Sequence, residues 1–273
     1  MIVDRINIYL SSQNTTFDTE LSQNVGKLAE LAFRRQFMEK RSQLPKTLRL
    51  SQGGHCSRKL AYSYHGFETK GKEIDSRAKV IFFMGDLVEL MIINLAQLAG
   101  CELTHTGLDQ KEIKLNINTL DIFGRPDGIS TDIFGHPDGF YKGRLVECKS
   151  MSSFAFEDFL NGKIEEGYLS QINLYLEAEG LTECILIGVN KDSGVLHELL
   201  IHKDEIRVTE AKANLHLVLQ STADRLPFAP AKFAPDHKGF YPWQCLYCAY
   251  HGHCRPNAAK VLVNKRYKLK EIK

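Results

Sequence analysis

The segment DIFGRPDGISTDIFGHPDGFYKGRLVECKS, residues 121–150, contains one short motif twice and ends in Glu-Cys-Lys. IFGRPDG begins at Ile122, and IFGHPDG begins at Ile133, eleven residues later. Each copy carries one aspartate, Asp127 in the first and Asp138 in the second. The segment therefore poses the question of which aspartate lies beside the acidic residue that follows.

The end of this segment, Leu-Val-Glu-Cys-Lys, has the composition of a short β-strand. Because side chains alternate across a strand, Glu147 and Lys149 share one face, while Val146 and Cys148 point to the other. Burying a carboxylate and an ammonium on an apolar strand is costly unless they serve a purpose. Taken alone, the Glu-x-Lys pattern is a weak signal and is more typical of a surface ion pair on a half-exposed strand.

The residues before this strand favour a buried site. Lys142-Gly143 suits a two-residue hairpin turn, although Asn-Gly would be a stronger signal. Counting outward from that turn places Asp138 opposite Glu147, with Cβ atoms about 4.5–5.5 Å apart. Two carboxylates opposed in this way repel unless a cation lies between them, and Mg²⁺ is normally held by one or two carboxylates. The predicted pairs are Tyr141 with Arg144, Phe140 with Leu145, and Gly139 with Val146.

The same count separates the two aspartates. Asp138 lies nine residues before Glu147, whereas Asp127 lies twenty residues before it. For Asp127 to reach the same metal, the second copy would have to be looped out of the hairpin. We therefore predict Asp138 as the metal-binding aspartate, with Asp127 as the alternative.

The remaining pattern predicts an α/β or α+β layered domain, because helices, a hairpin-rich sheet and further strands follow one another. Asp86 and Glu89 lie three apart within the second helix and so occupy neighbouring positions on it. The predicted helices are residues 18–42, 77–99, 168–178 and 204–222, with a basic helix start after Cys56, and the predicted strands outside the hairpin are residues 111–117, 183–189 and 196–201.

Composition and charge indicate an ordinary cytoplasmic protein. The 273 residues are 43% hydrophobic and 25% charged, with a net charge of +2, which does not by itself indicate a nucleic-acid binder. The sequence shows no apolar run that we expect to span a membrane, and the N-terminus lacks the apolar core of a signal peptide. Seven cysteines in an intracellular chain argue against a disulfide framework.

Three of these cysteines form a compact group, Cys245-x₂-Cys248-x₅-Cys254. Such spacing indicates a metal or cluster site that needs a fourth ligand. Completion by His251 or His253 would give a tetrahedral zinc site, and completion by Cys56 would give a four-cysteine site for zinc or an iron–sulfur cluster. The other three cysteines, which lie on apolar segments, are interpreted as core residues: Cys101, Cys148 and Cys184.

Taken together, these motifs resemble the RecB-like nucleases of the PD-(D/E)XK superfamily, and most closely their iron–sulfur branch. That branch includes the CRISPR-adaptation nucleases, their phage relatives and the nuclease domain of AddB. The resemblance covers roughly residues 50 to 255 and rests on four motifs in order with cysteines on both sides. The matching residues are Cys56 in HCSRKLAY, GDLVE at residues 85–89, the PDG aspartate, Glu147-Cys148-Lys149, Gln171-x₃-Tyr175, and the cysteine triplet.

The resemblance implies a restriction-endonuclease-like core, a central mixed sheet flanked by helices. It implies a 4Fe–4S cluster, held by Cys56, Cys245, Cys248 and Cys254, that joins the N-terminal and C-terminal segments. It also implies Mg²⁺ or Mn²⁺ at Asp138 and Glu147, aided by Asp86 or Glu89 and by the Cys148 backbone, with catalytic roles for Lys149, Gln171 and Tyr175. Many relatives carry a His where this chain has Asp86, and Asp makes the site harder and suited to these ions.

We therefore expect a metal-dependent DNA exonuclease that acts on single strands or DNA ends. The alternative is a non-catalytic DNA-binding or assembly subunit that keeps the nuclease fold. Candidate protein partners are a second copy of the chain or CRISPR-adaptation or recombination proteins, and no membrane partner is expected. The expected organisation is an N-terminal helical segment (1–50), the nuclease core closed by the cysteine cluster (51–254) and a basic C-terminal tail (255–273). That tail has seven Lys and Arg against one acid, and it is either solvated or in contact with phosphates.

Overall fold

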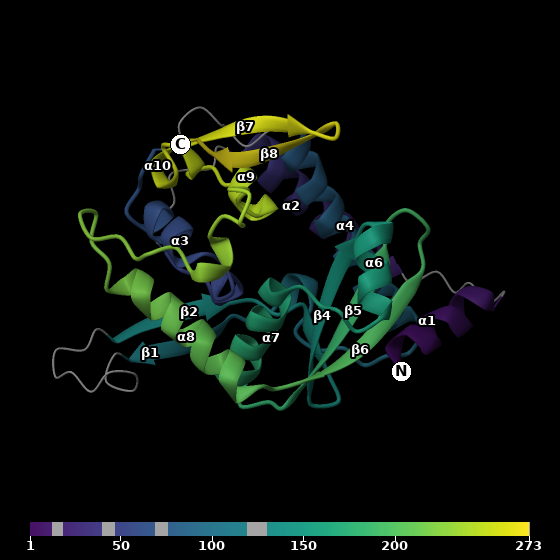
Figure 1. Ribbon diagram of the computed structural model, residues 1–273. Helices are drawn as coiled ribbons and strands as arrows, with labels where there is room; N and C mark the ends of the chain where they lie inside the picture. The colour runs from purple at the N-terminus through teal and green to yellow at the C-terminus, as the bar shows by residue number, and fades with distance from the viewer. Residues whose placement is uncertain (13–18, 40–46, 69–75, 119–129, 273) are drawn as a thin grey trace.

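The computed structural model describes residues 1–12, 19–39, 47–68, 76–118 and 130–272, so Asp127 and the rest of the first motif copy lie outside the described residues. At its centre is a mixed sheet with strand order β3-β4-β5-β6, in which only β4 and β5 run parallel. Helices lie on both sides of this sheet (Figure 1). The strands are β3 (Gly139–Tyr141), β4 (Arg144–Met151), β5 (Glu183–Asn190) and β6 (Leu196–His202).

The β3–β4 hairpin has the register that the sequence predicts. Gly139 pairs with Val146, Phe140 with Leu145 and Tyr141 with Arg144. The turn consists of Lys142 and Gly143, both with positive φ angles of 49° and 75°. A two-residue turn with positive φ at both positions matches the right-handed twist of the flanking strands. Asp138 and Glu147 therefore occupy the next facing positions beyond the last pair of this ladder.

Two helices connect the parallel strands β4 and β5, because parallel neighbours require a crossover. α6 (Ser153–Leu160) begins after Ser152, whose side chain accepts a hydrogen bond from the Ala155 N–H. α7 (Glu166–Glu179) ends at Gly180, which adopts a left-handed conformation with φ 65°. The sequence predicted α7 as residues 168–178 and did not predict α6. The crossover returns α7 over β4, which places its side chains beside Glu147 and Lys149.

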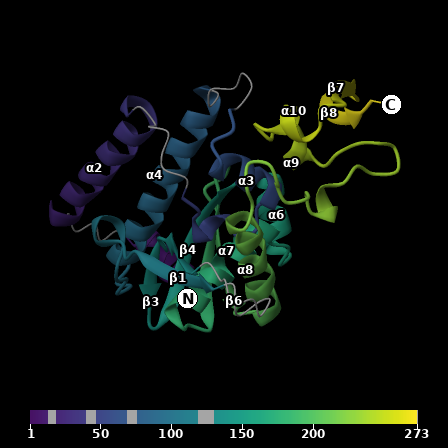
Figure 2. The same ribbon diagram turned by 90° about the vertical axis from the view of Figure 1, so that its left-hand side faces the viewer.

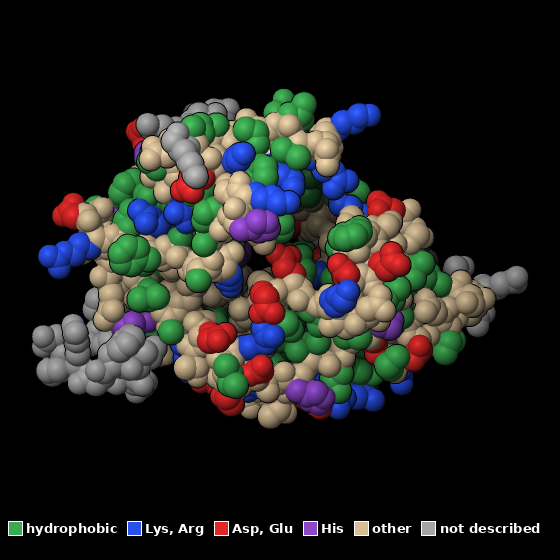
Figure 3. All heavy atoms as spheres, viewed as in Figure 1, with side chains coloured by type: hydrophobic (Ala, Val, Ile, Leu, Met, Phe, Trp, Pro, Cys, Tyr) green, Lys and Arg blue, Asp and Glu red, His purple; other side chains and the backbone are tan. Residues whose placement is uncertain are grey.

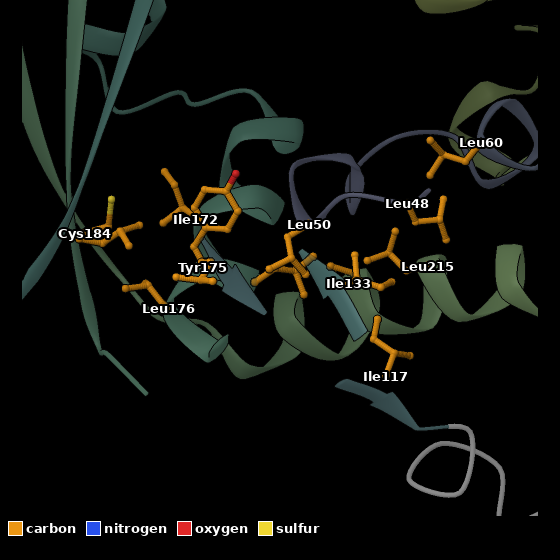
Figure 4. Close-up of a cluster of buried hydrophobic side chains, with 14 of the residues drawn as sticks. Leu48, Leu50, Leu60, Ile117, Ile133, Ile172, Tyr175, Leu176, Cys184 and Leu215 are labelled. Carbon is orange, nitrogen blue, oxygen red and sulfur yellow. The ribbon is translucent and has the colours of Figure 1, made fainter. Parts of the chain in front are cut away.

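The larger core lies between the sheet, α7, α8 (Glu205–Leu219) and the hairpin formed by β1 (Ile113–Asn118) and β2 (Ser130–Gly135). Figure 4 shows Leu50, Ile133, Tyr175 and Leu176 meeting in this core. Gly135 of the second motif copy leaves room for an aromatic ring, since a Cβ there would lie 2.5 Å from Tyr175 Cε1. The second copy is therefore built into the core that supports Tyr175.

On the opposite face of the sheet, α1 (Ile2–Ser11) and α4 (Ser76–Leu98) form a second core. Val146 and Cys148 of β4 are buried there. They point away from Glu147 and Lys149, as strand alternation predicts. Strand β4 thus supplies apolar side chains to one face and charged side chains to the other.

Helix α4 differs from the expectation that the chain has no apolar run long enough to span a membrane. Residues 78–98 are long and apolar enough to cross a membrane by length and composition, with a mean hydropathy of 1.7. In this fold, Ile92 and Ile93 in the second half of α4 are buried against α1 and the sheet. α4 also packs beside α2 (Thr19–Phe33), which continues into a π-helical turn, Arg34–Met38, within the helix predicted at residues 18–42.

The C-terminal region is a small unit with its own core of Tyr241, Leu246 and Leu269. Residues 255–273, for which the sequence indicated a basic tail, contain an antiparallel hairpin with a turn at Asn264 and Lys265. Figure 2 shows this unit on the right, with α2 and α4 on the left. The unit contains α9 (Trp243–Leu246), α10 (His251–Cys254), β7 (Ala258–Val263) and β8 (Arg266–Glu271), and α3 (Ser57–Tyr64) precedes it in the chain.

Candidate active site and cysteine centre

Asp138 and Glu147 form the base of a buried acidic site at the open end of the β3–β4 hairpin. Asp138 Oδ2 accepts a hydrogen bond of 2.7 Å from the backbone N–H of Cys148. Asp138 is 7% exposed and Glu147 is fully buried. The predicted neighbourhood of these two carboxylates is therefore present in the structure, and the backbone of Cys148 contributes to it.

Lys149 is the cation of this site. Its Nζ lies 2.7 Å from Glu147 Oε2 and 5.6 Å from the centroid of the Tyr168 ring. Burial opposes the charge on Lys149, but Glu147 and Asp138 outweigh that effect and raise the lysine pKa well above its usual value. Lys149 is therefore held as an ammonium between carboxylates on one side and an aromatic face on the other.

Gln171 and Tyr175 lie one turn apart on α7 and hydrogen-bond to each other. Gln171 Nε2 is 3.2 Å from Glu147 Oε2 and 3.2 Å from the Tyr175 hydroxyl oxygen. Tyr175 is buried, and burial, together with the Glu147 charge, raises its pKa. Gln171 therefore ties the carboxylate of Glu147 to a hydroxyl group that is itself fixed in the core.

The structure distinguishes Asp86 from Glu89. Asp86 Oδ2 is engaged by Arg35 at 2.8 Å and by Gln36 at 3.2 Å. Glu89 instead adjoins the acidic site, because besides burial the charges of Asp138 and Glu147 raise its pKa. Of the two acids on α4, Glu89 is thus the one that adjoins Asp138 and Glu147.

These three carboxyl groups hold protons unusually tightly. Burial, followed by repulsion from Asp138 and Glu147, raises the pKa of Glu89 to about 9. Burial, followed by repulsion from Asp138, raises the pKa of Glu147 to about 7. Burial also raises the pKa of Asp138, against the opposing effects of Lys149 and the Cys148 N–H. The positive charge of Lys149 is thus insufficient to balance the negative charge that three ionised carboxylates would bring to this site.

The chemistry of these donors fits a hard divalent cation. Glu147 Oε1 is buried and has no hydrogen-bond partner among the described residues. In the described part of the chain, no three His, Cys, Asp or Glu side chains are already arranged to hold a metal ion. Glu147 Oε2 lies 2.7 Å from Lys149 Nζ, and Asp138 Oδ2 accepts the hydrogen bond from the Cys148 N–H. Glu147 Oε1, which has no partner among the described residues, is the oxygen most available to such an ion.

The second predicted centre brings together cysteines that lie far apart in the sequence. Cys56 caps the start of α3, and the other three cysteines lie in or next to α9 and α10. All four line one cavity of about 640 Å³, and none is in a disulfide: Cys56, Cys245, Cys248 and Cys254. Burial, followed by repulsion from Cys56, raises the pKa of the Cys245 thiol to about 11. Cys56 is therefore close enough to the triplet to act electrostatically on it.

The two histidines near the triplet are placed differently. His251 lines the same cavity, and its Nδ1 lies 2.9 Å from the Cys248 carbonyl oxygen. His253 directs its Nε2 to the Glu68 carbonyl oxygen at 2.8 Å, and its ring packs against Tyr62 and Phe67. Four soft thiol ligands on one cavity wall fit zinc or an iron–sulfur cluster. Of the three candidates for the fourth ligand, Cys56 and His251 line the cavity that contains the cysteine triplet, whereas His253 does not.

The cavity also extends from the cysteines toward the acidic site. Tyr168 and Gln171 of α7 form part of its wall. Tyr168, which covers Lys149, was not predicted as a site residue. Its only sequence signal is its position three residues before Gln171, on the same face of α7.

Comparisons with known proteins give limited similarity. No family model matches the chain, and no curated protein matches it. Among solved structures, SSO0001 is similar over 87% of this chain and 96% of its own, with a TM-score of 0.49 and 18% identity. An alkaline exonuclease from Laribacter hongkongensis is similar over 70% of this chain and 90% of its own, with a TM-score of 0.42 and 15% identity. A complex of that exonuclease with dAMP gives the same coverage and TM-score at 16% identity.

Proposed function

We propose that this chain is a metal-dependent deoxyribonuclease, an exonuclease that hydrolyses phosphodiester bonds in single-stranded DNA or at DNA ends. The observation that carries the proposal is the group formed by the buried Asp138 and Glu147 and the partly buried Glu89, for which Lys149 is the one neighbouring ammonium among the described residues. Such an arrangement is unfavourable without a further cation, and buried ionisable groups with strongly shifted pKa values are typical of active sites.

In this proposal the three carboxylates hold Mg²⁺ or Mn²⁺, which would supply an activated water and neutralise charge on the scissile phosphate. The Lys149 ammonium holds the attacking water or stabilises charge on a phosphate oxygen. Gln171 holds Glu147 in place through its hydrogen bonds to Glu147 and Tyr175. Tyr168 covers Lys149 and limits access of bulk water to it.

The four cysteines hold a 4Fe–4S cluster in the same proposal. The cluster would join α3 to α9 and α10, which are 189 residues apart at Cys56 and Cys245. A cross-link between segments so distant removes much conformational freedom from the unfolded chain, so its role is structural. It would fix the C-terminal unit, including β7 and β8, against the nuclease core.

The deciding test is a cleavage assay on labelled single-stranded and overhang DNA with Mg²⁺ or Mn²⁺, using protein purified without oxygen. We expect cleavage that EDTA stops and that Lys149→Ala reduces on the order of 10²–10³-fold, the usual loss of one charge-stabilising donor. Lys142→Ala, which removes an exposed lysine at the β3–β4 turn, should leave the rate unchanged. DNA binding without any cleavage by fully metal-loaded protein would contradict the proposal and support the non-catalytic DNA-binding subunit.

A further inference from the structure

Two cavities share a wall on the C-terminal unit. The first, of about 640 Å³, contains the four cysteines and reaches Tyr168 and Gln171. The second, of about 670 Å³, lies between α9 and the strand β8. The residues common to both are Lys232, Pro242, Trp243 and Tyr247. A ligand that crosses this shared wall can therefore pass from β8 toward the acidic site.

The wall presents two large aromatic rings to solvent. Trp243 is 61% exposed and Tyr247 is 74% exposed. Trp243 begins α9, and Tyr247 lies four positions later at its end, so both rings project from one face. Their ring centroids are 6.5 Å apart. Adjacent aromatic faces left open to solvent are expected where flat ligands stack.

Positive charge surrounds these rings. Figure 3 shows Lys and Arg side chains gathered below the C-terminal hairpin, along the rim of a hollow that has acidic side chains in and below it. The cations that line the two cavities are Lys59, Lys232, Arg255, Arg266 and Lys268. None of the five is in an ion pair with a carboxylate of the described residues. Their charge is therefore not neutralised within the described chain.

The acidic residues in the cavity walls are fewer than the Lys and Arg residues, so the net charge of the walls is positive. Glu166 pairs with Arg207 on α8, and Glu165 lies at the start of α7. Asp236 accepts hydrogen bonds from the backbone N–H groups of Lys238 and Phe240, which fix the loop before α9. A basic groove with two stacked-ring positions is the arrangement that binds a single nucleic-acid strand, because unpaired bases expose their faces while a duplex does not.

We propose that Trp243 and Tyr247 form a base-stacking ridge over which single-stranded nucleic acid passes from the β8 cavity toward Tyr168 and the acidic site. This inference rests on the proposed nuclease function and adds the surface that selects single strands over duplexes. Lys232, Arg266 and Lys268 contact the phosphates on the β8 side, and Lys59 and Arg255 contact them on the side nearer the cysteines. The hairpin β7–β8 is then part of the substrate-binding surface.

The test measures binding separately from cleavage. Fluorescence anisotropy follows a 20-nucleotide oligothymidylate and a 20-base-pair blunt duplex on full-length, cofactor-loaded Lys149→Ala protein without added divalent cation. We expect Trp243→Ala to weaken oligothymidylate binding roughly 5-fold to 100-fold, the usual effect of losing one stacked base, and Trp243→Phe to retain most of it. Duplex binding should not change in either variant.

Two further measurements are the salt dependence of oligothymidylate binding and the site of a photocrosslink. Replacing Arg266 and Lys268 by Glu should reduce the slope of log K against log salt by about 0.7 for each lost phosphate contact. Lys142→Glu, at the distant β3–β4 turn, is the matched control and should leave the slope unchanged. Photocrosslinking with 5-iododeoxyuridine should label the peptide that contains Trp243 and Tyr247.

Unchanged oligothymidylate binding by Trp243→Ala, or an equal loss for the duplex, would overturn the ridge. So would a crosslink located only on other peptides. These outcomes are independent of the nuclease proposal, because no step of the binding test needs cleavage. Conversely, if the protein binds as described but never cleaves DNA, the proposed ridge is supported and the proposed nuclease function is contradicted.

Discussion

The Asp138 carboxylate accepts a 2.7 Å hydrogen bond from the backbone N–H of Cys148, ten residues later in the chain. Cys148 directly follows Glu147, so this bond holds the two carboxylates together across the hairpin. It depends on the register set by the Lys142-Gly143 turn. A shift of one residue would move Glu147 and Lys149 to the apolar face of β4 and disrupt both cores.

This bond leads to the first prediction, which concerns the two motif copies. Asp138→Ala should abolish cleavage, because it removes a proposed metal ligand that the fold holds beside Glu147. Asp127→Ala should keep most of the activity. The measurement is the initial rate on labelled single-stranded DNA at saturating Mg²⁺, with melting temperatures to confirm folding. Loss of activity only in the Asp127 variant would mean that the first copy is the functional one.

The two acids on α4 should differ in the same assay. Glu89→Gln should reduce cleavage strongly and weaken Mg²⁺ binding, since Glu89 adjoins Asp138 and Glu147. Asp86→Asn should leave the rate within a few-fold of wild type, because its carboxylate is occupied by Arg35 and Gln36. It should cost only about 0–1 kcal/mol of stability, as expected for a partly exposed ion pair. Equal loss in both variants would contradict this assignment.

Stability without divalent cations should fall as pH rises. A carboxyl group with a raised pKa in the folded state binds its proton more tightly there than in the unfolded chain. For Glu147 the penalty develops between its ordinary pKa of 4.5 and about 7, and for Glu89 between 4.5 and about 9. We expect the melting temperature to decrease from pH 5 to pH 9 and Mg²⁺ to reverse much of that decrease. A Glu89→Gln variant should have a flatter profile above pH 7, and a profile identical to wild type would count against the raised pKa of Glu89.

Packing beneath Tyr175 gives a stability prediction. A Cβ at position 135 would lie 2.5 Å from Tyr175 Cε1 and 3.1 Å from Leu50 Cβ, so Gly135→Ala should destabilise the fold by about 1–3 kcal/mol. It should also lower the cleavage rate by displacing Tyr175 and Gln171. Gly26→Ala is the matched control, because no atom lies within 4 Å of the new Cβ on helix α2. That change should stabilise the protein by about 0.5–1 kcal/mol in denaturant unfolding.

The cysteine centre is tested by spectroscopy and metal analysis. Protein purified without oxygen should be brown, with broad absorbance near roughly 400 nm, and contain about four iron atoms per chain. Cys56→Ser should lose this absorbance as completely as Cys245→Ser does, because both side chains line the same cavity. Cys101→Ala, in the second core, should keep it. A colourless protein with one Zn²⁺ would replace the iron–sulfur proposal by a zinc site.

Much of the hairpin site was predictable because its interactions are local. Pairing across a two-residue turn depends on residues 138–149, and strand alternation then fixes which side chains share a face. The i, i+4 relation of Gln171 and Tyr175 is equally local, and their hydrogen bond confirms it. The sequence did not reveal α1, α6 or the β7–β8 hairpin, whose apolar residues are few or are buried by segments distant in the chain.

Other features depended on contacts between distant segments. Only the packing of α4 shows that Glu89 faces the carboxylates while Asp86 pairs with Arg35. Only the tertiary fold places Cys56 beside the triplet and Tyr168 over Lys149. The sequence by itself determined the register of the hairpin and the identity of its charged residues, because turn chemistry and strand alternation act over a few residues. The position of the third carboxylate, Glu89, and of Cys56 beside the other three cysteines was decided by the tertiary structure, since each comes from a segment that packs against residues distant in the chain.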